Sequence, residues 1–157
     1  MTQGVLSFRR PGATDASAVR ELTRAAYAKW IPVIGREPKP MGADYSVTVR
    51  DHLVDLLIDG ENLVGLIEMV PGGDHLLIEN VAVRPDSQGN GLGHRLMLHA
   101  EQVAQKLRFS EVRLYTNSRF KENIRLYISL GYAIDSQDQI GDGFRVNMSK
   151  RLRFADA

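Results

Sequence analysis

ENVAVRPDSQGNGLGH, residues 79–94, is the most informative segment of the chain. An apolar strand ends before Pro85, a glycine-rich turn follows, and a helix begins at or near Gly91. The first turn of a helix leaves backbone N–H groups without partners, and the helix dipole places partial positive charge there. Because glycine lets the backbone approach a ligand closely, the segment predicts a main-chain cradle for a phosphate or diphosphate.

Two other phosphate loops fit this segment poorly. A Walker loop requires a Gly-Lys pair, and the chain contains none. A dinucleotide-binding loop has the spacing G-x-G-x-x-G, whereas Gly89, Gly91 and Gly93 give G-x-G-x-G and the sixth position is His94. The remaining alternative is a glycine-rich connector that binds no ligand. Motifs elsewhere in the chain are needed to distinguish it from a phosphate-binding loop.

The composition excludes several classes of protein. The 157 residues contain 20 Lys and Arg against 19 Asp and Glu, so no broad field favours nucleic acid or a membrane surface. The absence of Cys excludes disulfides and thiolate sites, and no His, Asp or Glu spacing indicates a metal site. Residues 1–11 lack the apolar core of a signal peptide. We expect one domain over residues 1–157, in the cytoplasm, with no metal, nucleic-acid or membrane partner.

The pattern of apolar residues around this segment predicts a mixed α/β fold with one central sheet. Asp59-Gly60 is a hairpin signal between two strands, and Pro71-Gly72-Gly73 is the next turn. The predicted strands cover residues 5–9, 52–58, 63–70, 76–83, 111–115, 132–137 and 144–150. The first helix is predicted to begin with Thr14 or Asp15 as its N-terminal cap. Further helices are predicted over residues 44–51, 91–107 and 121–130.

Two details of this assignment depend on local patterns alone. Pro32 is predicted to end the first helix, so that residues 31–41 form an ordered loop. Apolar residues at steps of three and four predict the buried face of helix 91–107, which comprises Leu92, Leu96, Ala100, Val103 and Leu107.

Three segments, in order, carry a family resemblance. Residues 88–93, QGNGLG, match the pattern Q/R-x-x-G-x-G/A at every fixed position, after the strand VAVRP at residues 81–85. Residues 123–132, NIRLYISLGY, contain a Leu-Tyr pair and a closing Gly-Tyr pair, and residues 8–15 read FRRPGATD. Together they resemble the GNAT superfamily of acyl-CoA-dependent N-acetyltransferases. The resemblance implies an α/β (α+β) fold whose mixed, mostly antiparallel sheet has a splayed pair of strands and helices on both faces.

The resemblance also implies a reaction. The acetyl group of acetyl-CoA moves to a primary amine of a small molecule or peptide, by direct attack in a ternary complex. A non-catalytic domain that binds or senses acyl-CoA on the same fold is one alternative, and a phosphate binder unrelated to coenzyme A is another.

For the cofactor, the resemblance implies two kinds of main-chain contact. The amides of residues 88–94 hold the diphosphate of coenzyme A, and the splayed strand at Val81 and Val83 pairs with the pantetheine. The residues assigned in this way are Val81, Ala82, Val83, Gln88, Gly89, Asn90, Gly91, Leu92, Gly93 and His94.

For the chemistry, the resemblance implies that Tyr127 donates a proton to the leaving thiolate and that the Val81 N–H stabilises the oxyanion. The alternative for Tyr127 is a packed aromatic ring whose hydroxyl bonds the backbone. An attacking amine must lose a proton, and strand alternation places Glu79 on the same face as Val81, so Glu79 is the first candidate base. A solvated carboxylate is its alternative role, and Glu68 and His75 are weaker candidate bases.

One position departs from the family pattern. Many members have Asn seven residues before the Tyr, where it contacts coenzyme A, and this chain has Phe120 there. Asn123 lies on the same helical face as Tyr127 and is one substitute, and Asn117 is another. Asn123 as a helix cap or a solvent-facing residue is the alternative.

The acceptor is expected to meet the first helix, the loop after it and the last hairpin. In the loop at residues 30–41 we assign Trp30 and Ile34 to substrate binding together with Glu79, and a loop that only covers the core is the alternative. The resemblance makes a homodimer plausible. The acceptor itself is not indicated by any residue pattern.

Overall fold

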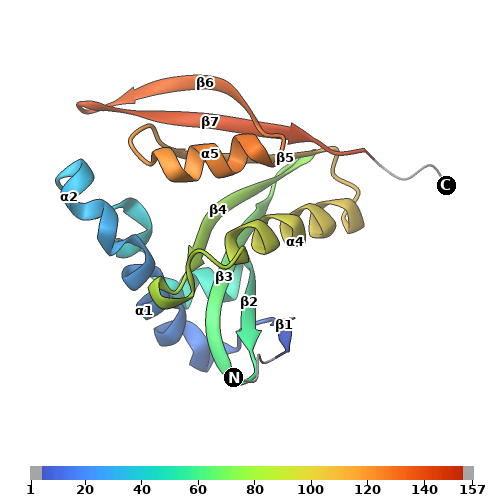
Figure 1. The fold of residues 1–157 in the computed structure, drawn as a ribbon. Helices are drawn as coiled ribbons and strands as arrows, with labels where there is room; N and C mark the ends of the chain where they lie inside the picture. Colours follow the sequence, from blue (N-terminus) through green and yellow to red (C-terminus); the bar gives the residue numbers. More distant parts are fainter. Residues whose placement is uncertain (1–4, 154–157) are drawn as a thin grey trace. The chain divides into compact units, whose positions relative to one another are not determined.

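The computed structural model describes residues 5–153 (Figure 1). Its strands are β1 (Leu6–Arg9), β2 (Leu53–Asp59), β3 (Asn62–Pro71), β4 (His75–Val83), β5 (Glu111–Asn117), β6 (Ala133–Ile140) and β7 (Gly143–Arg151). Its helices are α1 (Ala16–Tyr27), α2 (Ile31–Ile34), α3 (Tyr45–Asp51), α4 (Leu92–Lys106) and α5 (Lys121–Ser129), and its short 3-10 helices are η1 (Ala13–Asp15), η2 (Ala28–Trp30), η3 (Lys39–Gly42) and η4 (Pro85–Ser87).

Within the described residues the strands form one seven-stranded sheet in the order β1-β2-β3-β4-β5-β7-β6. β4 and β5 pair in parallel, and the pairs β1·β2, β2·β3, β5·β7 and β6·β7 are antiparallel. This confirms the predicted α/β class with a mixed, mostly antiparallel sheet. The parallel ladder between β4 and β5 ends at Ile78 and Leu114, although β5 continues to pair with β7 as far as Asn117.

The chain divides into two compact units, each described by itself. The first comprises the residues up to Met69 together with Asn80–Met97, and the second comprises Val70–Glu79 together with Leu98 and the residues after it. Both β4 and α4 therefore contribute to each unit. The expectation of one acetyltransferase domain over residues 1–157 stays a prediction.

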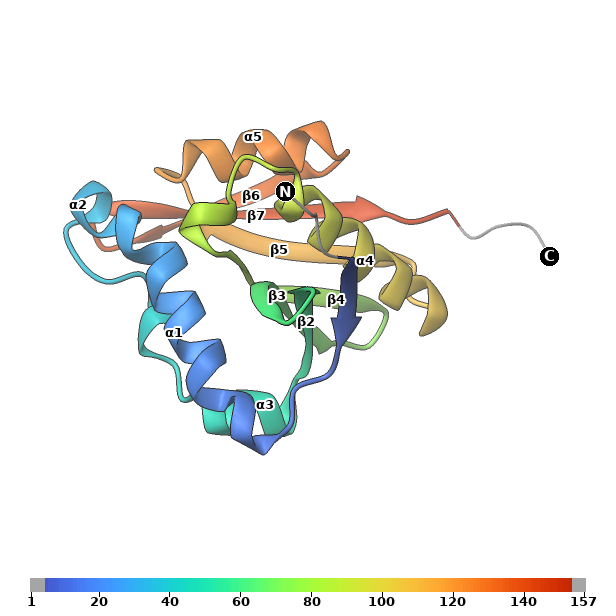
Figure 2. The same ribbon diagram turned by 60° about the horizontal axis from the view of Figure 1, so that its bottom comes forward.

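The first unit is built on the face of β2 and β3 that α1 and α3 cover. Val19, Leu22 and Ala26 recur at steps of three and four along α1, and all three are buried against Val54, Leu56, Ile58, Leu66 and Ala82. Figure 2 shows α3 beside the first turns of α1. The Asp44 carboxylate caps α3 by accepting from Ser46 N–H at 3.0 Å, so the predicted helix near residues 44–51 is confirmed.

Two local predictions in this unit are wrong. The chain does not leave the helical conformation at Pro32, because η2 and then α2 follow α1 directly. Pro32 lies in the first turn of α2, where its missing N–H has no helical partner to lose. Asp15 does not cap α1, because its carboxylate accepts from Gly12 N–H at 2.7 Å and pairs with Arg9.

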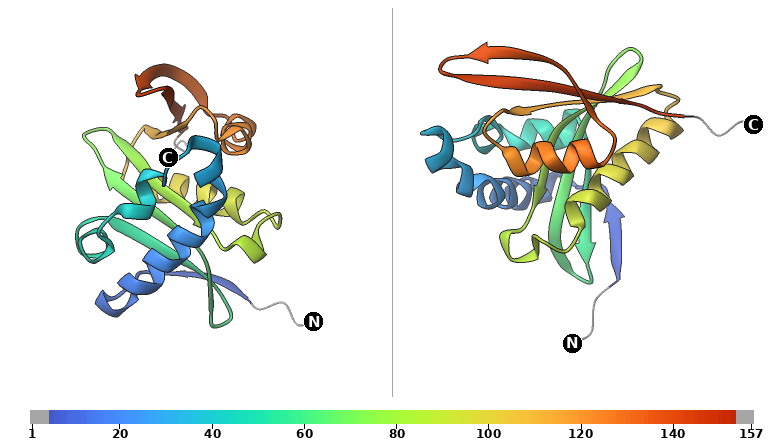
Figure 3. Two further views of the ribbon diagram at one scale, coloured as in Figure 1. Left: turned by 90° about the vertical axis from the view of Figure 1, so that its left-hand side faces the viewer. Right: turned by 45° about the horizontal axis from the view of Figure 1, so that its top comes forward.

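The second unit contains the end of α4, β5, α5 and the β6–β7 hairpin. Figure 3 shows α5 lying beside this hairpin. Val112, Leu114, Val146 and Met148 are buried and alternate with less buried residues along β5 and β7, which is the pattern of a sheet with one covered face. All eight residues of β6 are exposed.

The predicted buried face of α4 is correct for Leu96 and Ala100 but wrong for Leu107, which lies beyond the last turn and is 46% exposed. Met97 and Ala104 are buried instead. No helix among residues 5–153 is long and apolar enough to cross a membrane.

Candidate active site

The glycine-rich loop enters α4 with its backbone in the left-handed region. Gly89 has φ +85° and Gly91 has φ +76°, values that side chains with a Cβ rarely adopt. The first helical bond of α4 runs from Arg95 N–H to Gly91 C=O, at 3.1 Å. The amides of Leu92, Gly93 and His94 therefore precede the helical ladder and stay available to an anion.

The space beside these glycines is open. A Cβ atom built on Gly89 or on Gly91 would meet no heavy atom within 4 Å. The two glycines are therefore required by their backbone conformation and not by crowding from the protein. His94, in the first turn of α4, is exposed, as is Asn90. This matches the geometry predicted for a diphosphate cradle, whose ligand has to approach from outside.

The end of β4 presents its main chain on both edges. Arg84 N–H donates to Val64 C=O at 2.9 Å, so Arg84 and, by alternation, Ala82 direct their backbone groups toward β3. The backbone groups of Val81 and Val83 then face the opposite edge. There Tyr27 Oη donates to Val81 C=O at 3.3 Å, and Gln88 Nε2 donates to Val83 C=O at 3.1 Å. Side chains thus occupy both carbonyls at this edge.

Between its two edges, β4 is fixed to the helices by Asn80. Its Nδ2 donates to Thr23 Oγ1 at 3.2 Å and to Tyr45 Oη at 3.4 Å, and both hydroxyls donate onward to backbone carbonyls. Asn80 is 2% exposed, and its Oδ1 has no hydrogen-bond partner among the described residues. The Asn80 carboxamide therefore fixes the backbone of β4 directly before Val81.

The pairing of β4 with β3 differs by one residue between its two ends, while burial alternates along the whole of β4. Gly72 N–H donates to His75 C=O at 2.7 Å, which pairs these residues at the turn, and Arg84 pairs with Val64 at the other end. From the turn to that pair, β4 advances one residue more than β3, which is the definition of a bulge. The shift does not disturb the order of the side chains, because Glu79 and Val81 are both half-buried and are separated by the buried Asn80, so they lie on the same face of β4 as the sequence predicts.

Glu79 is positioned by a contact that the sequence analysis missed. Tyr115 Oη, on β5, donates a short hydrogen bond to Glu79 Oε1. Arg145, on β7, places its guanidinium 5.4 Å from the centroid of the Tyr115 ring. Glu79 and Tyr115 are both half-buried, so the carboxylate is held in place and is still accessible. The parallel pairing of β4 with β5 brings these residues together, and a sequence pattern does not contain that information.

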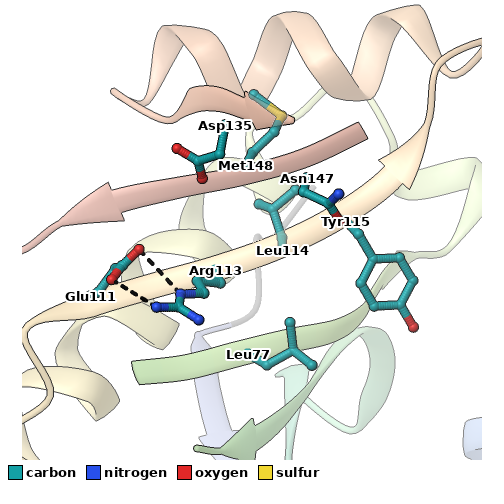
Figure 4. Close-up of a pocket in the computed structure, with 8 residues that line it drawn as sticks. All are labelled: Leu77, Glu111, Arg113, Leu114, Tyr115, Asp135, Asn147 and Met148. Atoms are coloured by element: carbon teal, nitrogen blue, oxygen red, sulfur yellow. Dashed lines mark hydrogen bonds and ion pairs between the residues drawn. The ribbon is translucent and has the colours of Figure 1, made fainter. Parts of the chain in front are cut away.

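A shallow cavity of about 400 Å³ lies next to this pair in the second unit (Figure 4). Within it, Arg113 Nε and Nη2 donate to the Glu111 carboxylate at 3.2 and 3.3 Å. This ion pair holds the pKa of Glu111 below its usual range. The lining comprises Leu77, Glu111, Arg113, Leu114, Tyr115, Asp135, Asn147 and Met148.

Tyr127, the predicted proton donor, is buried in the same unit. Its ring packs edge-to-face against Tyr132, with the centroids 6.3 Å apart, and it is 9% exposed. Among the described residues none forms a hydrogen bond with its hydroxyl, so the alternative role of a backbone-bonded ring finds no support. Burial raises the pKa of Tyr127 to about 12, so the phenol keeps its proton at physiological pH.

The two candidate substitutes for the missing Asn differ in what their side chains do. Phe120 is 5% exposed and directly precedes α5. Asn117 Oδ1 accepts from Arg119 N–H at 2.9 Å, so Asn117 shapes the turn between β5 and α5. Asn123 is half-buried in the first turn of α5. Asn117 is half-buried as well, so the choice between Asn117 and Asn123 stays a prediction.

The weaker candidate bases have partners of their own. Glu68 is 4% exposed, and its Oε2 lies 2.6 Å from His52 Nδ1. His75 Nδ1 lies 3.1 Å from Asp74 Oδ1 on the exposed turn before β4. Glu68 is thus buried on β3 and His75 is the first residue of β4, whereas Glu79 is half-buried at the middle of β4.

The residues assigned to the acceptor lie in η2 and α2. Trp30 is 8% exposed, and Lys29 Nζ lies over its ring at 5.1 Å from the centroid. Ile34 is half-buried and directly precedes Gly35, whose φ of +75° ends α2. Because Trp30 is buried, its ring is less available to a substrate than we expected. Among the described residues no group of three or more His, Asp or Glu side chains could hold a metal ion.

Comparison with known proteins was made at the level of sequence and of fold. A model of the acetyltransferase (GNAT) family matches residues 18–132. A search of curated proteins finds no match.

Solved structures with the same fold share little sequence. The ribosomal-protein-S18-alanine N-acetyltransferase from Escherichia coli is 19% identical with a TM-score of 0.75, and the match covers 97% of each chain. The PaiA N-acetyltransferase from Thermoplasma acidophilum, solved with coenzyme A, is 20% identical with a TM-score of 0.71, over 94% of this chain and 99% of that one. YncA from Salmonella typhimurium, solved with acetyl-CoA, is 18% identical with a TM-score of 0.71, over 98% of each chain.

Proposed function

Because this chain belongs to the acetyltransferase (GNAT) family, with acetyl-CoA as its co-substrate, we propose that it acetylates a primary amine of a small molecule or a peptide. The observation that carries the proposal is the open cradle at Gly89 and Gly91, which leads into α4 directly after the end of β4. A ternary complex and direct attack by the amine are part of the proposal.

The cradle and the β4 edge bind the donor. In this proposal the amides of Gln88 to His94 hold the diphosphate, and the backbone groups of Val81 and Val83 pair with the pantetheine. The Val81 carbonyl accepts from Tyr27 and the Val83 carbonyl from Gln88, and because a carbonyl oxygen has two lone pairs, each can also accept from an amide of the pantetheine. Asn123 adds a side-chain contact from α5.

Glu79 and Tyr127 move the protons. Glu79 takes a proton from the acceptor ammonium, directly or through water, and the neutral amine nitrogen attacks the thioester carbonyl. The Val81 N–H stabilises the oxyanion. After the attack the nitrogen loses its second proton to solvent, which leaves a neutral amide. As the C–S bond breaks, Tyr127 gives its proton to the sulfur; afterwards Tyr127 regains a proton from solvent and Glu79 releases the one it took. Its raised pKa keeps the proton in place until the thiolate forms.

Tyr115 positions the base. Its hydrogen bond to one oxygen of Glu79 leaves the second oxygen for the amine proton. The acceptor amine is proposed to lie against this pair, and the assignment of Trp30 and Ile34 to the acceptor stays a prediction from the resemblance. A cytoplasmic location and a homodimer remain predictions from the resemblance.

Free thiol released from acetyl-CoA in the presence of a panel of amines and N-terminal peptides tests the proposal. We expect release above the no-amine control for at least one primary amine, and N-acetylated product of matching mass. Tight binding of acetyl-CoA with no amine-dependent release across the panel would support the alternative, a domain that binds acyl-CoA without catalysis. Failure to bind acetyl-CoA at all would reject both.

A further inference from the structure

A lysine of the first unit lies against the signature loop. Lys29, in η2, donates from Nζ to Gln88 Oε1 at 3.1 Å. Gln88 is the first fixed residue of the Q/R-x-x-G-x-G/A segment, directly before Gly89. The same ammonium lies 5.1 Å from the centroid of the Trp30 ring, within the range of a cation–π interaction. Two contacts thus hold this positive charge in place.

The Gln88 carboxamide connects Lys29 to β4 by two hydrogen bonds. Its oxygen accepts from Lys29 and its Nε2 donates to Val83 C=O at 3.1 Å, so both ends of the amide are engaged. These two bonds fix which end of the amide carries the oxygen. Lys29 therefore lies where the free edge of β4 leads into the cradle.

A full positive charge at the cradle would add to what its main chain supplies. Backbone amides and a helix N-terminus provide partial charges, whereas a diphosphate carries full negative ones. Arg84, which also borders the loop, pairs with Asp86 at 2.8 Å, so its charge is shared with a carboxylate. A Lys ammonium has three rotatable donors and can keep the Gln88 contact while it turns a second N–H toward a phosphate oxygen.

We propose that Lys29 is a ligand of the diphosphate of the acyl donor and is the side-chain cation of a site otherwise built from main chain. This inference rests on the proposed function, because it assigns a further residue to the same donor site. Lys29 acts on binding and not on the acetyl-transfer step, so its removal weakens the donor complex and leaves the chemistry of the bound complex unchanged.

Two ligands and matched variants separate the diphosphate contact from general packing. Coenzyme A contains the diphosphate, and pantetheine lacks it. In Lys29→Met, which keeps an unbranched stem over Trp30, we expect the Kd for coenzyme A to rise about five- to tenfold and that for pantetheine to change less than about twofold. Lys29→Arg should retain most of the affinity. Lys106→Met, at the last residue of α4, removes the same charge elsewhere and should leave both Kd values unchanged.

Calorimetry of each variant with both ligands, at two salt concentrations, decides the matter, with the melting temperature as a check of folding. The increase in the Kd for coenzyme A that Lys29→Met causes should be smaller at the higher salt concentration, because the lost contact is ionic. An unchanged Kd for coenzyme A in Lys29→Met would overturn the proposal. Equal weakening of both ligands would overturn it too, since that is the result of disturbed packing.

The same experiments distinguish this inference from the proposed function. Wild-type protein that binds coenzyme A and acetylates an amine, with Lys29→Met unaffected in donor binding, rejects the role of Lys29 alone. A raised KM for the amine with an unchanged Kd for coenzyme A places Lys29 at the acceptor and also rejects its role as a diphosphate ligand. Wild-type protein that binds no coenzyme A rejects both.

Discussion

The loop that enters α4 and the Glu79–Tyr115 pair in the second unit are built from different chemical groups. The loop offers main-chain amides whose directions are set by two left-handed glycines. The pair, like Tyr127 in the same unit, offers side chains whose protonation is set by burial and hydrogen bonds. This difference indicates that donor binding and proton transfer depend on separate parts of the chain, so substitutions should change one without the other.

The largest effect should come from the proposed base. Glu79→Gln keeps an acceptor for Tyr115 but cannot take a proton, so we expect kcat to fall about 100- to 1,000-fold while the Kd for acetyl-CoA stays within about twofold. Steady-state kinetics and calorimetry measure the two quantities.

Glu68→Gln is the matched control for that substitution. Glu68 is buried against His52, so its loss should lower the free energy of unfolding by about 1–3 kcal/mol and leave kcat within about threefold. A larger loss of kcat in Glu68→Gln than in Glu79→Gln would move the base to β3.

Tyr127→Phe should have the next largest effect. The phenylalanine keeps the packing against Tyr132 and removes the only proton the ring can donate, so we expect kcat to fall about 10- to 100-fold. Binding of coenzyme A should not change. Full activity in this variant would remove Tyr127 from the mechanism and restore a purely structural role for it.

A substitution in the glycine-rich loop is expected to weaken donor binding and leave kcat unchanged. Gly91→Ala places a Cβ in a left-handed conformation, which costs about 1–2 kcal/mol of stability, and it puts that Cβ into the open space that the ligand should use. We expect the Kd for coenzyme A to rise about tenfold, with kcat at saturating donor nearly unchanged.

Gly60→Ala is the control for Gly91→Ala, because Gly60 has φ +64°, open surroundings and a place in the β2–β3 turn. It should cost similar stability and leave donor affinity unchanged. Equal affinities in the two variants would mean that the cradle does not hold the donor.

The smallest effect concerns pH. Tyr127 with a pKa of about 12 stays protonated well above pH 9, whereas an ordinary tyrosine with a pKa near 10 would be mostly ionised at pH 10.5. After the rise expected between about pH 6 and 9, as the amine and the base lose protons, kcat should therefore fall less than about twofold up to pH 10.5. A roughly fourfold fall in kcat between pH 9 and 10.5, absent from the pH profile of Tyr127→Phe, would show that the phenol ionises at its ordinary pKa.

The parts of the fold that local sequence determines were predictable. Left-handed glycines, a helix start and an apolar periodicity are all properties of a few neighbouring residues, so the loop at residues 88–93 and most strands and helices could be assigned. Pro32 was misread because proline is excluded from the interior of a helix but accepted in its first turn, and a new helix begins there.

The parts that depend on distant residues were not predictable in this way. Tyr115 reaches Glu79 through a parallel strand pair, and the register difference between β3 and β4 appears only when both ends of their pairing are known. The burial of Trp30 and the contact between Lys29 and Gln88 likewise depend on how a helix meets a loop far along the chain.

The cradle has a consequence for how such chains diverge. Every residue except proline has a backbone N–H, so a site made of amides constrains the path of the chain and leaves most side chains free to vary. Proteins about one-fifth identical to this one keep its fold over nearly their whole length. If the proposed site is correct, substitutions on the surface that meets the acceptor can therefore accumulate without changing the main-chain contacts to the donor.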